Sequence, residues 1–308
     1  MEKMIDERVR RILIKYVCVI ILAFAAVFAG ISLLLNLSST NPAKLNEGNP
    51  GKLLPVMRAY YETMYPYREV YNINEVEAEG FGSYKIHLSI IDHREKIEIG
   101  RANVIMAMKR GKLSITNDTE GLTVFNVPFN EDGSSKKQKA KELRELAEEI
   151  RKLPESSRLY LSIKGEAPIS IASLMEKSKG KFQAEWAQVY EPGCDFQAGL
   201  SLNLSAVHKD SDMRHTLTGK QLKQVYLENL KLLRDNMEIW KNLDMPSNSS
   251  IFNADSQLLD ELIQKGEKSQ TFQTVYYCVS ADRDGILAYL NSGGFDQVAV
   301  DRVQCSTL

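Results

Sequence analysis

The sequence predicts an α+β protein with a single N-terminal transmembrane helix, an extracytoplasmic antiparallel β-rich region and a C-terminal α/β sandwich that contains two β-α-β units. Three observations support this fold class. Residues 16–37 form an uncharged apolar run, and about 20 apolar residues are enough to cross a bilayer. Apolar and polar residues alternate within 84–127, as in strands with one solvated face. The order strand, helix, strand occurs twice between residues 158 and 308.

The apolar run has basic residues on its N-terminal side. Five Lys and Arg residues precede it, whereas the next basic residue after it is Lys44. Because Lys and Arg accumulate on the cytoplasmic side of a membrane, we expect a single-pass protein of the cell membrane with a cytoplasmic N-terminus and an extracytoplasmic C-terminal domain. The alternative is a cleaved signal peptide with a small-residue site near 26–29. Residues 31–35 continue the apolar run past that site, which favours the anchor.

Changes in composition divide the chain into five segments. Ser, Asn, Pro and Gly dominate the stretch after the apolar run, where two Asn-Pro dipeptides indicate turns and therefore a linker. A second polar break, NEDGSS, begins at Asn130. The expected segments are a cytoplasmic tail (1–15), the transmembrane helix (16–37), a linker (38–55), a membrane-proximal β-rich region (56–130) and a C-terminal α+β domain (131–308).

Charge gives no indication of a polyanionic partner. The chain has 39 Lys and Arg residues against 40 Asp and Glu residues, so direct binding to nucleic acid is not expected. Of the four cysteines, Cys18 lies in the apolar run, and Cys194, Cys278 and Cys305 lie outside it. Because three is an odd number, at least one of these thiols is expected to be free or paired between chains.

A tyrosine-rich stretch follows the linker. Its rings could belong to an interfacial aromatic belt or to a peptide-binding surface. The favoured interpretation is that a short helix at 56–64 packs some of them against the following sheet, because burial is the commoner use of aromatic area. The tyrosines are Tyr60, Tyr61, Tyr65, Tyr67 and Tyr71.

The β-rich region is expected to be an antiparallel meander. Apolar residues alternate with polar ones along its first strand, at Tyr84, Ile86, Leu88 and Ile90. Further short strands are expected at 97–99, 104–108, 113–116 and 122–127. His87 and His93 lie in this region without a second ligand at a useful spacing, so both are expected on the surface rather than at a metal.

The C-terminal half repeats one scheme. A strand at 159–163 is followed by a helix that Ser170 caps and Gly180 ends, and then by a strand at 182–190. At the end of the chain, a strand at 272–280, a helix at 282–291 stopped by Gly293 and Gly294, and a strand at 297–303 repeat the order. Two such units in one sheet, with helices covering a face, favour an α+β sandwich.

Three more helices and a strand are expected in the C-terminal half. A charged helix with an apolar stripe begins near Ser134 and extends to Pro154. Between the two β-α-β units, a strand is expected at 200–204. The next helix starts with a capping box at 218–221, and its apolar stripe continues to Trp240. The last of them covers 256–265 and is expected to end at Gly266.

The sequence contains no familiar catalytic motif: GxSxG, HExxH, GxxxxGKS/T and GxGxxG are all absent. Ser205 or Ser211 could pair with His208 as a nucleophile, but such pairs are defined by geometry rather than by proximity in a loop. We therefore assign no catalytic, cofactor-binding or metal-binding residue and expect a protein that is not an enzyme and has no cofactor. The best metal candidates, whose spacing matches no common ligand pair, are His208, Asp210, Asp212 and His215.

Two segments of the C-terminal half carry a family resemblance. LYLSIKGEAPISIASLMEKSKGKFQAEWAQVYEP, at 159–192, has an apolar strand, a turn with Pro168, a short helix and a strand with Trp186. It resembles the first part of the sigma-factor regulator C-terminal domain, and TVYYCVSADRDGILAYLNSGGFDQVAVDRVQ, at 274–304, resembles that domain's closing strand, helix and strand. The membrane segment with its basic flank and the tyrosine-rich stretch resemble the N-terminal region of the same family.

The resemblance implies a membrane-anchored anti-sigma factor of Gram-positive bacteria. Its outer domain would receive an envelope signal of unknown chemistry, and its inner part would regulate an extracytoplasmic-function sigma factor. The tail of about 15 residues is short for an independent sigma-binding domain, so the implied partner is a sigma factor or a second membrane regulator, with membrane lipid around the single helix. The alternative is an anchored envelope scaffold or cell-wall-acting enzyme, which would bring two carboxylates, or a Ser/His or Cys/His pair, together from separate elements.

Overall fold

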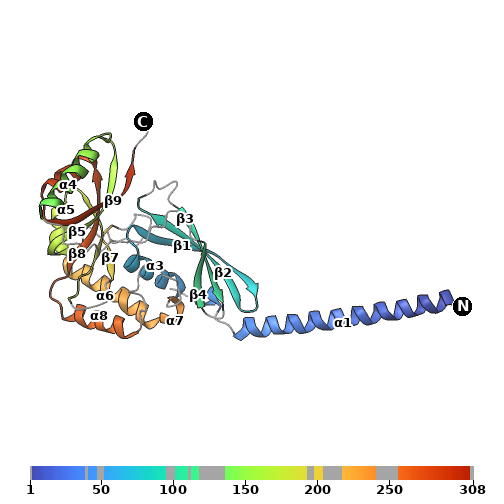
Figure 1. Ribbon diagram of the computed structural model, residues 1–308. Helices are drawn as coiled ribbons and strands as arrows, with labels where there is room; N and C mark the ends of the chain where they lie inside the picture. The colour runs from blue at the N-terminus through green and yellow to red at the C-terminus, as the bar shows by residue number, and fades with distance from the viewer. Residues whose placement is uncertain are drawn as a thin grey trace.

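The computed structural model has a long N-terminal helix and two antiparallel sheets (Figure 1). This arrangement is an α+β fold, as expected. The structure describes residues 2–38, 41–46, 52–94, 101–109, 112–117, 136–192, 198–203, 217–240 and 256–305.

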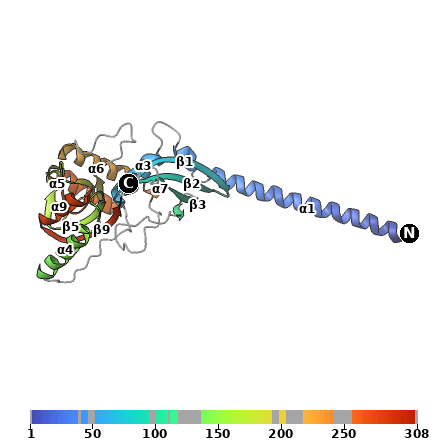
Figure 2. The same ribbon diagram turned by 90° about the horizontal axis from the view of Figure 1, so that it is seen from above.

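Helix α1 (Glu2–Ser38) contains a segment, Ile12–Leu37, that is long and apolar enough to cross a membrane. None of this segment is buried inside the protein. Figures 1 and 2 show α1 extending away from the rest of the chain. A helix with apolar residues all round needs an apolar environment, so α1 is consistent with a membrane anchor or a signal sequence.

Two helices occupy the stretch in which turns were expected. The short α2 (Pro42–Asn46) starts with an Asn-Pro pair that begins a helix instead of a turn, because proline fits the first helical position. The longer α3 (Leu53–Met64) begins inside the expected linker and buries Leu53 and Val56. Tyr60, Tyr61, Tyr65 and Tyr67 are all buried, which confirms the packing interpretation of the tyrosine-rich stretch.

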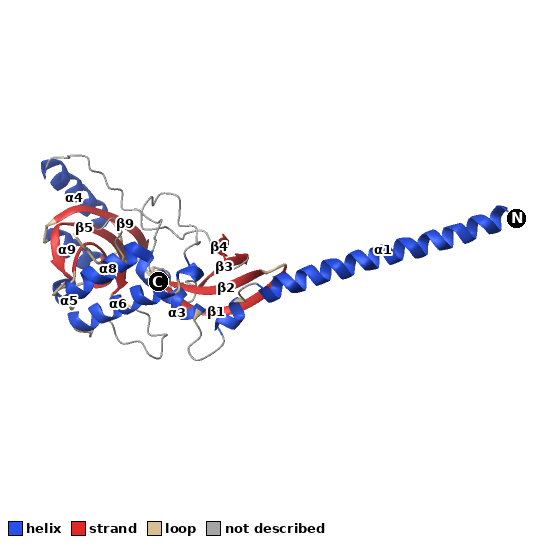
Figure 3. Cartoon of the chain, turned by 90° about the horizontal axis from the view of Figure 1, so that it is seen from below, coloured by secondary structure: helices blue, strands red, loops and turns tan. Residues whose placement is uncertain are grey.

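The first sheet is an antiparallel meander in chain order, as expected, but its first strand precedes all the strands that the sequence predicts (Figure 3). Ile86 and Leu88 of its second strand point into the core, while Lys85 and His87, which alternate with them, are partly exposed. The start of the first strand (68–70) and the end of the second strand (88–92) are buried on both faces. The strands expected at 97–99 and 122–127 lie outside the described residues. The strands are β1 (Arg68–Gly80), β2 (Ser83–Asp92), β3 (Arg101–Lys109) and β4 (Lys112–Asn117).

The second sheet contains both expected β-α-β units, interleaved. Its strand order is β7-β6-β8-β5-β9, and every neighbouring pair is antiparallel. Each unit is therefore split, because β8 separates β5 from β6 and β5 separates β8 from β9. This is the ferredoxin-like arrangement. The strands are β5 (Arg158–Ser170), β6 (Gln183–Gln188), β7 (Gly199–Ser201), β8 (Gln273–Asp282) and β9 (Phe295–Gln304).

The crossover helices start and stop where the sequence predicts. Helix α5 (Ile171–Ser178) is capped by Ser170, whose side chain accepts a hydrogen bond from the Ser173 N–H. In α9 (Arg283–Asn291), Asp282 caps the Gly285 N–H in the same way. Gly180, Gly293 and Gly294 follow the helices with positive φ, the left-handed conformation that ends a helix without a Cβ penalty.

Two helix boundaries differ from the prediction. The stripe to Trp240 is split into α6 (Gly219–Asp235) and α7 (Met237–Trp240) at Asn236, whose side chain donates to the Leu232 carbonyl. Helix α8 (Ser256–Lys268) continues past Gly266. A Cβ on Gly266 would lie 3.0 Å from Leu227 Cδ2, so this glycine permits close packing on α6 rather than ending the helix. The expected capping box at Thr218 and the charged helix, α4 (Lys136–Arg151), are present.

The two faces of the second sheet pack against different hydrophobic clusters. Leu159, Leu161 and Val279 belong to the main hydrophobic core, which also includes residues of α3 and the first sheet. The alternate residues face a second, smaller cluster made of Tyr67, Tyr160, Trp186 and Cys278. Polar side chains of the first sheet reach this second face, and they form the candidate site.

Candidate functional site

Charged and polar side chains converge where the ends of β1 and β2 meet the second face of the β5–β9 sheet. We call this group the junction cluster. It combines residues from two sheets that are far apart in the sequence. From the first sheet and its flanks come Tyr67, Arg68, Glu69, Asp92, His93 and Arg94, and from the second come Ser162, Glu185, Ser280 and Asp301.

His93 lies between two carboxylates, one from each sheet. Its Nε2 is 3.3 Å from Glu69 Oε2, and its Nδ1 is 3.9 Å from Glu185 Oε2. The three side chains are only 9, 5 and 2 % exposed, respectively. Burial lowers the pKa of His93, but the hydrogen bond to Glu69 and the charges of Glu185, Glu69 and Asp92 outweigh it and hold the pKa above its usual value. The geometry therefore favours an imidazolium that bridges the sheets.

Glu185 is held by neutral donors as well as by His93. Ser280 Oγ donates to its Oε1, and Asn203 Nδ2 donates to its Oε2 at 2.7 Å. Arg158 Nη2 in turn donates to Ser280 Oγ at 2.7 Å. These contacts keep the Glu185 carboxylate in one position.

Asp92 pairs with two arginines beside His93. Arg94 binds it through Nε (2.9 Å) and Nη2 (2.6 Å), and Arg68 Nε lies 3.6 Å from Asp92 Oδ2. Burial raises the pKa of Asp92, but the hydrogen bonds and charge of Arg94 outweigh it and hold that pKa below the usual value. The Arg94 guanidinium also stacks over the Tyr67 ring at 5.3 Å from its centroid.

Tyr67 attaches the start of β1 to the second sheet. Its single hydroxyl proton is shared between two acceptors, the Leu161 carbonyl (2.9 Å) and Asp301 Oδ2 (3.1 Å), and the latter also accepts from Ser162 Oγ. Its backbone φ is +64°, which is an uncommon conformation for a residue other than glycine. Burial raises the pKa of Asp301. Tyr67 therefore supplies a hydrogen bond that this buried carboxylate needs.

Replacing Tyr67 with phenylalanine is expected to destabilise the protein by about 1–3 kcal/mol, because the Leu161 carbonyl and the Asp301 carboxylate would lose the one buried O–H donor that they share. Urea unfolding of the full chain in detergent measures this loss. Tyr71, which is only partly buried, provides the matched control, since Tyr71→Phe should change the midpoint much less. Equal midpoints for the two variants would contradict the assignment.

The cysteines outside α1 differ in exposure. Cys278 is buried and Cys305 is exposed, and neither forms a disulfide. Burial raises the pKa of the Cys278 thiol, so it stays protonated and unreactive. Cys194 lies outside the described residues.

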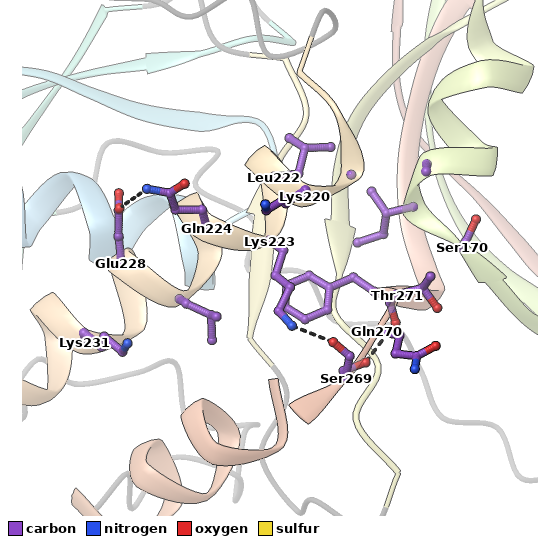
Figure 4. Close-up of a pocket in the computed structure, with 15 residues that line it drawn as sticks. Ser170, Lys220, Leu222, Lys223, Gln224, Glu228, Lys231, Ser269, Gln270 and Thr271 are labelled. Atoms are coloured by element: carbon purple, nitrogen blue, oxygen red, sulfur yellow. Dashed lines mark hydrogen bonds between the residues drawn. The ribbon is translucent and has the colours of Figure 1, made fainter. Parts of the chain in front are cut away.

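Two adjoining cavities of the described chain lie away from His93. The first, of about 620 Å³, lies between α5, α6 and the residues before β8 (Figure 4). The other, of about 860 Å³, lies between α5, the start of β6 and the start of α6. In the first, Lys223 Nζ donates to the Ser269 and Glu267 carbonyls, and Lys231 pairs with Glu267. These lysines are engaged by the chain itself. A smaller cavity of about 260 Å³, lined by Arg158, Gln183 and Ser280, reaches the edge of the junction cluster.

The sequence-based candidates and the junction cluster barely overlap. His208, Asp210, Asp212, His215, Ser205 and Ser211 lie outside the described residues. Within the described chain, no group of His, Cys, Asp and Glu is arranged to hold a metal ion. His87 is partly exposed beside Glu77, as expected. The expectation of a surface position for His93 is wrong: β2 carries it under the second sheet, and its partner Glu69 is 24 positions away.

The other end of the β1–β2 hairpin lies against α1. The ring centroids of Phe28 and Phe81 are 4.6 Å apart. The Phe81 N–H donates to Ser32 Oγ at 3.3 Å, and the Gly82 N–H donates to Asn36 Oδ1 at 2.7 Å. The hairpin therefore connects the apolar helix with the junction cluster, over a length on the order of 40 Å for a 13-residue strand.

Comparison of the chain with protein-family models, with curated proteins and with solved structures finds no match.

Proposed function

We propose that this chain is a membrane-anchored signalling protein that regulates an extracytoplasmic-function sigma factor. Its outer part would sense an envelope state and pass it through α1 to a sigma factor or a second membrane regulator. One observation supports the proposed relay. A continuous connection runs from α1 along β1 and β2 to the buried charges beneath the second sheet.

The junction cluster suits a relay because its ion pairs persist only while the two sheets keep their relative position. A buried ion pair contributes little compared with apolar packing, but removing one partner costs about 3–5 kcal/mol. His93, Glu69 and Glu185 come from both sheets, so a shift of one sheet against the other would break the pairs. A ligand or partner that moves the second sheet would thereby act on the hairpin and on α1.

The sigma-factor part of the proposal is supported by the sequence resemblance. The segments that carry it, 159–192 and 274–304, contain β5-α5-β6 and β8-α9-β9, which are the two split β-α-β units. Residues 2–15 are helical and continuous with the apolar segment. A partner in the cytoplasm would therefore contact a basic helical extension of the anchor.

The test is affinity purification of the full chain from detergent-solubilised host membranes, followed by mass spectrometry. The matched control carries residues 2–11 in scrambled order, which keeps the basic residues that set orientation. We expect a sigma factor or a small membrane protein with the native tail and its loss with the scrambled tail. Recovery of envelope components alone, or equal recovery with both tails, would contradict the sigma-factor proposal.

A membrane-anchored envelope scaffold or cell-wall-acting enzyme remains the second candidate. The convergence of Glu69, His93 and Glu185 from separate elements is the arrangement that an enzyme would need. We favour a structural role for these groups because all three are buried. Release of soluble fragments from purified cell wall by the full chain, abolished by Glu185→Gln, would instead establish the enzyme.

A further inference from the structure

The tip of the β1–β2 hairpin has an unusual composition. Its three residues are Gly80, Phe81 and Gly82, and all have positive φ, at +89°, +52° and +72°. Glycine adopts this conformation freely, whereas a phenylalanine there is strained. The tip thus presents one large apolar ring between two glycines, and that ring packs against Phe28 of α1.

The contact has a defined position along α1. Phe28, Ser32 and Asn36 are spaced by four residues and therefore share one side of the helix. A hydrocarbon core of about 30 Å takes about 20 helical residues. Counted from Tyr16, where the uncharged run begins after Lys15, these residues end at Leu35. Phe28 and Ser32 then lie on the inner side of the outer boundary, and Asn36 lies at it.

The polar groups at the tip suit this position. Near the hydrocarbon boundary, backbone N–H groups need partners within the protein because water is scarce. The N–H groups of Phe81 and Gly82 have such partners in Ser32 and Asn36. Ser32 and Asn36, two polar residues at the end of an apolar segment, thereby gain hydrogen-bond donors for their side-chain oxygens. Further from the tip, Glu79 and Lys85 form an ion pair at 2.7 Å that is well exposed, as suits the headgroup region.

We propose that the hairpin tip is a second membrane contact of this protein, with the Phe81 ring entering the outer edge of the lipid hydrocarbon region beside Phe28. The proposal rests on the proposed role of α1 as a membrane anchor. It places the hairpin on the bilayer surface, so that the outer region is held at two points rather than through α1 alone.

The test is quenching of tryptophan fluorescence in vesicles of phosphatidylcholine with and without bromine on the acyl chains. Full chains carrying Phe81→Trp, Glu77→Trp or Leu22→Trp are compared with the wild type, whose own Trp186 and Trp240 are buried. Glu77 lies on the same hairpin about 13 Å from Phe81. Leu22, in the middle of the apolar segment, is the positive control.

We expect brominated lipid to remove most of the added fluorescence of Phe81→Trp and Leu22→Trp and little of that of Glu77→Trp. Equal, weak quenching of Phe81→Trp and Glu77→Trp, with strong quenching of Leu22→Trp, would overturn the hairpin contact alone. A wild-type chain that fails to float with the vesicles would overturn the anchor itself. If Phe81→Trp loses its fold by circular dichroism, Ser83→Trp reports on nearly the same depth.

Discussion

Replacing Gly199 with alanine is expected to lower the free energy of unfolding by about 3 kcal/mol, at the upper end of what overpacking costs. An added Cβ would lie 1.7 Å from Cζ2 and 2.2 Å from Cε2 of Trp186. The indole has little room to move, because it is buried and its Nε1 donates to the Glu62 carbonyl at 2.9 Å. Glu62 belongs to α3, so the clash would also disturb the contact between α3 and the second sheet.

Urea unfolding of the full chain in detergent, followed by tryptophan fluorescence, measures this effect. Gly219→Ala is the matched control, since its Cβ would meet Ala172 Cβ at an ordinary 3.4 Å. That control should change stability by less than about 1 kcal/mol. A Gly199→Ala chain with the wild-type midpoint would show that Trp186 is not fixed as described.

The features that the sequence predicts well are those set by neighbouring residues. Ser170 and Thr218 each cap a helix through a residue three positions ahead, a distance within reach of local pattern reading. The alternation along β2 likewise reports one buried face. Both β-α-β units were predictable for the same reason, since each consists of elements consecutive in the chain.

The features that escaped prediction depend on contacts between distant segments. Gly266 has the local signature of a helix end, yet its close contact with Leu227 of α6 keeps α8 continuous. The interleaving of the two units follows from strand pairing, which no local pattern encodes. His93 has no signal in its own neighbourhood, because its partners come from β1 and from β6 of the other sheet.

The protein is expected to lose stability as the pH rises above about 6.5, the usual pKa of histidine. The folded-state pKa of His93 is raised above that value, so the charged imidazole binds its proton more tightly in the folded than in the unfolded chain. This stabilisation is fully present below the unfolded pKa and disappears as the pH passes the folded pKa. Above it, Glu69 and Glu185 would face a neutral ring as two buried negative charges.

Urea midpoints of the full chain between pH 6 and 9 measure this dependence, and His93→Gln should flatten it. His87→Gln is the matched control, because His87 also lies on the β1–β2 hairpin but pairs with the exposed Glu77. Glu69→Gln should cost about 3 kcal/mol at pH 6, as expected for breaking a buried ion pair, and should reduce the slope. Identical slopes for the wild type and His93→Gln would contradict a charged His93. If the pH dependence of the urea midpoint disappears in His93→Gln, protonation of His93 stabilises the attachment of the β1–β2 hairpin to the second sheet.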